Sequence, residues 1–245
     1  MKTENRTLVQ GSEEWYRARL GKITASCFHK VMTKPRSGGG MSQTALTYMR
    51  ELIGERLTGQ PADEIHSKYL DHGNKYEPVA RAMYLATSDR DDHKVELIGF
   101  FDHPSLPWVG GSPDMLVDDD GIGEIKCPYT TKNHIEFLEL DEITEKSHKP
   151  YFWQCQGNMW LSNRHWMDFV SFHPGFPKPL QLKVMRLQRD DDAYERLEEE
   201  MPRFLQQTQI KLLKMIDPLS QSERQSLIDN NSLDTPLITD GKESK

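Results

Sequence analysis

A hairpin pattern between Pro113 and Lys126 constrains this chain more than any other feature of its sequence. Two apolar runs, 115–117 and 122–126, flank the turn-forming residues 118–121, which read Asp-Asp-Asp-Gly. Such runs around a short polar turn predict two antiparallel strands joined by a hairpin loop. Folding about this turn would bring Asp114 opposite the second strand.

The second strand of this hairpin carries an acid and an amine on one face. Side chains alternate along a strand, so Glu124 and Lys126 share a face while Ile125 points into apolar packing on the other. With Asp114 opposite, two carboxylates and one amine converge. This set could hold Mg2+ through hard oxygen ligands, beside a cation that orients or deprotonates a water for attack on phosphorus. A Glu-x-Lys pair alone is usually a solvated face, but the complete set favours a catalytic site.

Length and composition fit a soluble globular protein. With 245 residues, of which 36% are hydrophobic, the chain can bury a sizeable core. We expect a single domain over residues 1–217 and a polar, loosely held tail of unknown role over 218–245. No apolar run approaches the ~18 residues that span a membrane, and the N-terminus lacks a signal pattern. The expectation is a cytoplasmic protein without membrane contact.

The three cysteines, Cys27, Cys127 and Cys155, are scattered and include no C-x-x-C pair. An odd number without metal-ligand spacing predicts neither a disulfide framework nor a zinc site. We expect reduced thiols in packing positions.

Charge is distributed unevenly along the chain. The net charge is -7, yet residues 15–50 contain seven basic residues and no acidic one. A basic segment on an acidic body can contact a phosphate backbone locally, so Lys22, Lys34 and Arg36 are candidate DNA contacts. The last two lie in a glycine-rich loop at 34–40. Chance segregation of charge is the alternative interpretation.

Periodicity predicts an α/β or α+β domain with a central mixed sheet. Ser12 and Thr24 are expected to cap the first two helices. Pro78 is expected to kink or divide the fourth. The predicted helices are 12–20, 24–31, 45–57, 65–86, 132–140, 148–162 and 190–215. The predicted strands are 95–101, 108–110, 115–117, 122–126, 165–173 and 180–187.

Five blocks of sequence, in this order, resemble the bacteriophage lambda exonuclease family, a group of phage-type alkaline exonucleases. They are 15–26, 73–77, 112–114, 124–128 and 154–160, and the resemblance covers roughly residues 12–215. It implies a restriction-endonuclease-like PD-(D/E)XK core, a mixed sheet flanked by helices. It also implies a Mg2+-dependent exonuclease acting 5' to 3' on linear double-stranded DNA, a ring-shaped homotrimer, and a single-strand annealing protein as partner for recombination.

The resemblance also implies roles for individual residues in catalysis. Asp114, Glu124 and the main-chain carbonyl of Ile125 would bind Mg2+, with two ions per site and Mn2+ as a substitute. Lys126 would position and activate the water. Glu77 would serve the second metal or its water shell, and Gln154 would lie beside the attacking water.

For DNA binding, the resemblance implies a pocket for the 5'-terminal phosphate. Arg19, Ser26 and Ser112 match it, and a guanidinium with hydroxyls suits a phosphate. Leu70 matches an apolar wedge that separates the two strands. Pro78 directly follows Glu77 and disfavours helical geometry there, which bears on the placement of that glutamate.

Two other functions remain open at this point. A restriction-type DNA endonuclease would share the fold and metal site but would cut closed circular DNA. A non-catalytic protein that binds DNA ends would retain DNA without consuming it. Linear and covalently closed circular substrates distinguish these possibilities.

Overall fold

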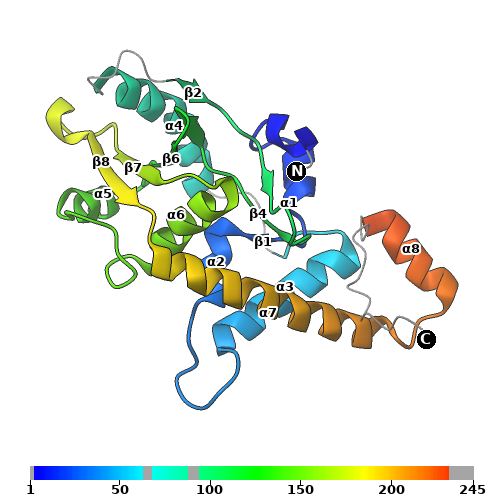
Figure 1. Cartoon of the computed structure of the whole chain (residues 1–245). Helices are drawn as coiled ribbons and strands as arrows, with labels where there is room; N and C mark the ends of the chain where they lie inside the picture. The colour runs from blue at the N-terminus through cyan, green and yellow to red at the C-terminus, as the bar shows by residue number, and fades with distance from the viewer. Residues whose placement is uncertain (1–2, 63–67, 88–93, 232–245) are drawn as a thin grey trace.

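A five-stranded mixed sheet forms the centre of the protein (Figure 1). The computed structural model describes residues 3–62, 68–87 and 94–231. Only β6 and β7 pair in parallel, and the other neighbours are antiparallel. This confirms the predicted mixed sheet. In spatial order its strands are β2 (Val95–Glu96), β5 (Met115–Val117), β6 (Gly121–Lys126), β7 (Trp166–Phe172) and β8 (Leu182–Gln188).

The predicted hairpin is present as β5 and β6. Met115 pairs with Gly123 and Val117 with Gly121, so the register places Asp114 beside the end of β6. The backbone turns at Asp118, whose φ of 48° lies in the left-handed region that aspartate tolerates better than most residues. Asp114, Glu124 and Lys126 therefore belong to one continuous hairpin.

A smaller sheet, with the strand order β1-β4-β3, lies beside the first. It includes part of the segment that was predicted as one strand over residues 95–101. Its strands are β1 (Ile23–Thr24), β4 (Val109–Gly111) and β3 (Phe101–Asp102). The expectation of one strand over 95–101 was wrong, because β2 and β3 belong to different sheets. Between them, the amides of Gly99 and Phe100 donate to carbonyls of the N-terminal segment, which includes the short helix η1 (Thr3–Thr7).

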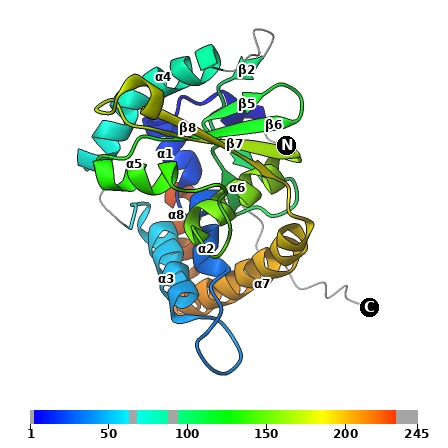
Figure 2. The ribbon, with the colours of Figure 1, turned by 90° about the vertical axis from the view of Figure 1, so that its left-hand side faces the viewer.

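Helices cover both faces of the large sheet (Figure 2). Helix α4 (Lys68–Thr87) packs on the face that carries Ile125, through Ala80 and Tyr84. Helix α6 (Lys149–Ser162) packs on the opposite face, where Glu124 points. Helix α5 (Thr131–Leu138) contacts β7. The alternation of side chains along β6 thus assigns its acid and its amine to the α6 side.

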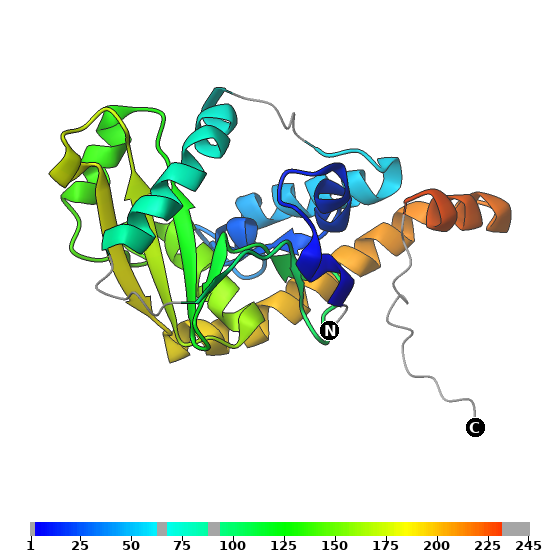
Figure 3. The same ribbon diagram turned by 90° about the horizontal axis from the view of Figure 1, so that it is seen from above.

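The remaining helices surround the small sheet and the end of the large one (Figure 3). Ser12 caps α1 by accepting from the amide of Trp15, as predicted. Thr24 makes no cap, because its hydroxyl faces Ser26, and the predicted helix over 24–31 divides in two. These elements are α1 (Glu13–Arg19), η2 (Ala25–Cys27), α2 (Phe28–Val31), α3 (Gln43–Thr58), η3 (Lys178–Leu180) and α7 (Asp191–Ile216).

Of the two effects expected of Pro78, division of the fourth helix is wrong, because the proline lies inside an undivided α4. Asn74, whose carbonyl loses its helical partner, is exposed, so water can replace the missing amide. Residues 221–231 form helix α8 (Gln221–Asn231), which contacts α3, so this part is not a loosely held tail. The expected start of the fourth helix near residue 65 and residues 232–245 lie outside the described residues.

Within the described ranges, no helix has the length and apolar character needed to cross a bilayer. The three cysteines are free thiols, as the absence of paired spacing predicted.

Gly121 holds a position where no side chain fits. A Cβ there would lie 2.1 Å from the ring of Trp166, whereas one at Gly54, within α3, meets nothing within 4 Å. We expect Gly121→Ala to lower the free energy of unfolding by roughly 1–3 kcal/mol or more. Gly54→Ala should raise it by about 0.5–1 kcal/mol, because alanine suits a helix better. Denaturant titration of both variants tests this, and equal stabilities would contradict the close packing of the hairpin turn.

Candidate active site

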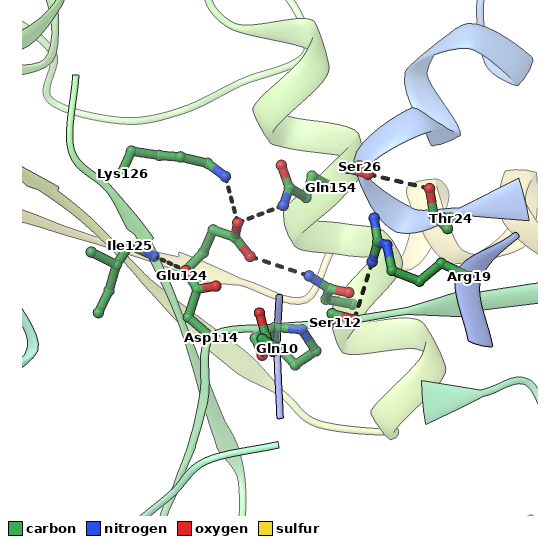
Figure 4. Close-up of polar contacts among 12 residues, drawn as sticks. Gln10, Arg19, Thr24, Ser26, Ser112, Asp114, Glu124, Ile125, Lys126 and Gln154 are labelled. Atoms are coloured by element: carbon green, nitrogen blue, oxygen red, sulfur yellow. Dashed lines mark hydrogen bonds and ion pairs between the residues drawn. The ribbon is translucent and has the colours of Figure 1, made fainter. Parts of the chain in front are cut away.

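A cleft of about 910 Å³ opens between the N-terminal segment, α1, α4, α6 and the ends of β5 and β6. It gathers residues that are more than 130 positions apart in the sequence, since Arg19 and Gln154 both line it. Figure 4 shows the polar contacts within this region. The candidates that line the cleft are Arg19, Ser26, Leu70, Glu77, Ser112, Asp114, Ile125, Lys126 and Gln154.

Glu124 is the polar centre of the site, although it lies just beneath the cleft wall at 2% exposure. Its Oε1 accepts from Nζ of Lys126 at 2.6 Å and from Nε2 of Gln154 at 2.5 Å. Its Oε2 accepts from Nδ2 of Asn158 at 3.3 Å (Figure 4). Three donors fix the carboxylate, so its position is defined before any ligand binds.

Asp114 lies opposite Glu124, and the two carboxylates are close enough to influence each other's charge. Its Oδ2 accepts from the main-chain amide of Ile125 at 2.5 Å. Burial, and next the neighbouring carboxylate of Glu124, raise the pKa of Asp114 well above its ordinary value. The pair is therefore deficient in positive charge, which a divalent cation would supply.

Lys126 carries the positive charge nearest to the two acids. Burial alone would lower its pKa, but the carboxylates of Glu124 and Asp114 outweigh burial and raise it above the ordinary 10.5. The ammonium thus stays charged at neutral pH, and its Nζ is 5.7 Å from the ring centre of Tyr151. A charged lysine orients water or phosphate as a donor and does not act as a base.

The donor set fits Mg2+ in one specific way. Among the described residues, no three Asp, Glu, His or Cys side chains lie close enough to enclose a metal ion. Mg2+ nonetheless binds commonly through one or two carboxylates, with water and substrate phosphate completing the shell. Asp114 and Glu124 supply such carboxylates, and Ile125, whose carbonyl is the third candidate ligand, directly follows Glu124 in sequence. The residues present therefore fit the ion.

Glu77 reaches the cleft from α4 on the other side of the hairpin. Its carboxylate pairs with the guanidinium of Arg81, one turn along the helix. Burial raises the pKa of Glu77, while Arg81 opposes the shift. Pro78 does not displace it from the cleft, because α4 continues through the proline. The geometry places Glu77 near the other two acids but already held by a cation.

A second polar centre surrounds Arg19. Its Nη1 donates to Oγ of Ser112 at 3.1 Å, and its guanidinium lies 4.2 Å from the ring centre of Trp15. No salt bridge joins Arg19 to a carboxylate in the described chain, and burial lowers its pKa. The Oγ of Ser26, which also lines the cleft, is 3.2 Å from the Oγ1 of Thr24. A guanidinium with two hydroxyls nearby is suited to an anionic ligand.

The structure does not bring every candidate DNA contact to the cleft. The Nζ of Lys22 pairs with Asp102 at 2.5 Å, and this lysine is absent from the cleft wall. Lys34 and Arg36 lie on the connection between α2 and α3, which projects away from the sheet in Figure 1. Their contact with DNA stays a prediction that this cleft does not support.

Two contributing residues escaped the sequence analysis. Asn158 donates to Glu124 from the same helix face as Gln154, and the spacing of four residues was the available signal. Trp15 supports Arg19 by the same spacing on α1, and its Nε1 donates to Ser112 at 3.1 Å. Neither spacing is distinctive unless the positions of Glu124 and Ser112, the groups that these side chains contact, are already known.

This chain is similar to a known protein family and to several solved structures. Residues 14–165 match the family described as YqaJ-like viral recombinase domain. The crystal structure of an alkaline exonuclease, LHK-Exo, from Laribacter hongkongensis is 37% identical, with a TM-score of 0.73, covering 83% of this chain and 96% of that one. The structure of LHK-Exo in complex with dAMP is 36% identical, with a TM-score of 0.74, and covers 84% and 97%.

Two further matches are more distant. A phage related exonuclease from Haemophilus somnus 129PT is 23% identical with a TM-score of 0.63, covering 81% of this chain and 96% of that one, and so shares the fold. The DNA polymerase III subunit alpha of Vibrio cholerae is 26% identical over 152 residues. That match covers 60% of this chain but 13% of the much longer polymerase subunit.

Proposed function

This chain belongs to the YqaJ-like viral recombinase domain family, and we propose that it is a Mg2+-dependent exodeoxyribonuclease acting on linear double-stranded DNA. In this proposal it digests one strand from the 5' end, releases 5' mononucleotides and leaves a 3' single strand for recombination by strand annealing. The alkaline exonuclease relative, at 37% identity over nearly its whole length, supports the reaction class. The dAMP complex of that relative supports a nucleotide product.

One observation carries the proposal. A single cleft contains a guanidinium, that of Arg19, which pairs with no carboxylate among the described residues, and its wall also holds or covers a buried acid-acid-lysine set. The first suits a terminal phosphate and the second suits the phosphodiester that is cut. An enzyme that cuts next to a strand end needs both groups in one continuous space. An internal cutter has no use for the terminal pocket.

The residues divide the work as follows. Asp114, Glu124 and the carbonyl of Ile125 would hold Mg2+, which supplies a Lewis acid that activates water and neutralises charge at the phosphate. The charged Lys126 donates a hydrogen bond to the attacking water or to a phosphate oxygen. Gln154 and Asn158 keep the Glu124 carboxylate in place. Arg19 and Ser112 hold the 5' phosphate so that the next linkage meets the acids.

Several finer points belong to the proposal and follow from the family resemblance. A second ion would use Glu77, and Mn2+ would substitute for Mg2+. Leu70, which is 37% exposed on the cleft wall, would separate the strands. A single-strand annealing protein would take the exposed 3' strand. A phage or prophage origin would place the protein in the cytoplasm of a bacterial host.

The proposed assembly is a ring-shaped homotrimer that encircles DNA. If so, sedimentation equilibrium should give about three times the chain mass of 28.4 kDa, in line with the closed symmetry common among homo-oligomers. A strictly monomeric enzyme that remains processive on long duplexes would contradict the ring.

Linear and covalently closed circular duplexes, incubated separately with Mg2+, test the proposed function. The proposal requires mononucleotide release from linear DNA and none from closed circles. Cutting of closed circles would indicate a restriction-type endonuclease. DNA that is retained but never consumed would indicate a protein that binds ends without catalysis.

Arg19→Ala should reduce the preference for 5'-phosphorylated ends. A terminal phosphate carries more charge than an internal diester, and a charge-assisted hydrogen bond contributes about 1.5–3 kcal/mol, so we expect roughly a tenfold or larger loss of this preference. Linear duplexes with 5' phosphate or 5' hydroxyl ends, labelled at either end, provide the measurement. Arg17→Ala is the matched control, because Arg17 lies on the same helix but is exposed and paired with Glu13. Release of label first from 3' ends would refute the polarity.

A further inference from the structure

Tyr69 and Tyr129 are the only exposed aromatic side chains among the Phe, Tyr and Trp residues of the described chain. They are 57% and 45% exposed. They also touch: their ring centres are 5.4 Å apart and their planes meet at 83°. Aromatic rings contribute most to stability when buried, so two exposed rings in mutual contact call for a ligand that covers them.

These two rings lie at the mouth of the proposed catalytic cleft. Tyr69 is in the first turn of α4 and lines the cleft together with Leu70. Tyr129 lies three residues after Lys126, the last residue of β6, and contacts Tyr69. A strand that reaches the acids along this wall can therefore contact the ring pair as well.

The ring pair is supported from beneath. His72, one turn along α4, has its ring centre 5.3 Å from that of Tyr129 and 4.7 Å from that of Tyr76. Tyr76 in turn packs against the core residue Phe172, at 6.5 Å between ring centres. A ring pair anchored to the core in this way presents a fixed surface at little further cost in conformational entropy.

A cation completes the surface. The Nζ of Lys68 is 5.3 Å from the ring centres of both Tyr69 and Tyr129. Exposed aromatic faces beside a lysine are the combination that binds single-stranded DNA, because bases stack on the rings while the cation neutralises the backbone. Duplex DNA hides its base faces within the stack and cannot use the rings.

We propose that Tyr69 and Tyr129, with Lys68, form a stacking platform for unpaired DNA bases at the cleft mouth. This inference rests on the proposed exonuclease function, which must open base pairs to feed one strand to the acids. The chemistry recognised is a base with its adjacent phosphate. It could belong to the strand being cut or to the strand left behind.

Fluorescence anisotropy with labelled single-stranded oligonucleotides tests the platform. The protein is kept in the presence of a chelator of divalent metal ions, which prevents digestion. Tyr69→Ala and Tyr129→Ala should each weaken binding roughly five- to a hundredfold, the range associated with base stacking. Tyr69→Phe and Tyr129→Phe keep the rings and should bind like the wild type. Val184→Ala is the control, since Val184 is an exposed apolar residue of β8 outside the cleft wall.

Abasic sites distinguish the two sources of the base. In partial duplexes with an unpaired 5' or 3' end, abasic residues on the strand that uses the platform should remove the difference between wild type and the alanine variants. Unchanged single-strand binding in both alanine variants would overturn the platform, as would an equal loss in the phenylalanine variants or an equal loss on blunt duplex. Duplex digestion by the wild type is scored separately, so failure of the exonuclease proposal remains distinguishable from failure of the platform.

Discussion

Asp114→Asn is expected to reduce digestion of linear duplex DNA by more than about a hundredfold while leaving the protein folded and able to bind DNA. Losing even an outer partner of a metal ligand typically costs about 10–100-fold, and this change removes a direct ligand charge. The substitution hardly alters volume, and the asparagine carbonyl can still accept from the amide of Ile125. Single-turnover kinetics and DNA binding, measured side by side, provide the test.

The same variant should also be more stable to heat than the wild type when no metal is present, which is a measurement independent of activity. The pKa of Asp114 is raised in the fold, so its ionisation opposes folding as pH rises above the ordinary value of 3.8. Without metal at neutral pH, Asp114→Asn should therefore unfold at a higher temperature than the wild type, and the difference should vanish in acid. Ca2+ should raise the melting temperature of the wild type only. Substantial activity in the variant, or equal stabilisation by Ca2+, would refute the metal site.

Glu124→Gln is a less clean test of the same site. Glu124 accepts hydrogen bonds from Lys126, Gln154 and Asn158. A glutamine amide nitrogen cannot accept, so at least one buried donor would lose its partner at a cost of about 1–3 kcal/mol. We therefore expect this variant to lose stability as well as activity, unlike Asp114→Asn.

Lys126→Met is expected to lower turnover by roughly 10²- to 10⁴-fold with little change in DNA affinity, the range for a positioned group that acts in the transition state. Methionine keeps much of the aliphatic packing but removes the ammonium that contacts Glu124. Because the pKa of Lys126 is raised above 10.5, the lysine stays charged through the alkaline range. Any rise of wild-type activity toward alkaline pH should then come from ionisation of water.

The pH profile separates the possible roles of Lys126. If the lysine were a general base, the alkaline rise would disappear in Lys126→Met, whereas a positioning donor leaves its shape intact at a lower level. Lys126→Arg keeps the charge and provides the comparison variant. Weakened DNA binding with normal turnover would reduce Lys126 to a phosphate contact.

The hairpin could be predicted from sequence because its signals are local. The turn at 118–121 sets the register, and alternation then assigns Glu124 and Lys126 to one face. The family resemblance extended this to Arg19 and Ser112, which the structure brings together. Local signals and matched blocks therefore covered most of the cleft wall.

The features that could not be predicted depend on contacts with residues distant in sequence. The strand over 95–101 breaks because carbonyls of Asn5 and Arg6 take the amides of Gly99 and Phe100, and no pattern near residue 95 announces those partners. The ion pair of Lys22 with Asp102, 80 residues away, was likewise not predictable from local sequence, and the contact of Lys22 with DNA stays a prediction. Helix α8 has a mostly polar sequence without a clear apolar stripe, so periodicity could not predict it. It packs against α3, and this contact helps to stabilise it.

Helix α6 contacts both polar centres of the cleft, so its packing can set the length of the DNA fragment that is released. Gln154 and Asn158 of this helix hold Glu124, while Gly157 between them packs so closely against the ring of Phe28 that a Cβ would lie 2.4 Å from it. Phe28 begins α2, directly after the turn η2 that carries Ser26. If Arg19 and Ser26 bind the terminal phosphate as proposed, the distance from that phosphate to the cut linkage would be set by packing between helices, independently of DNA sequence. Such an enzyme would release fragments of uniform length from DNA of any base sequence.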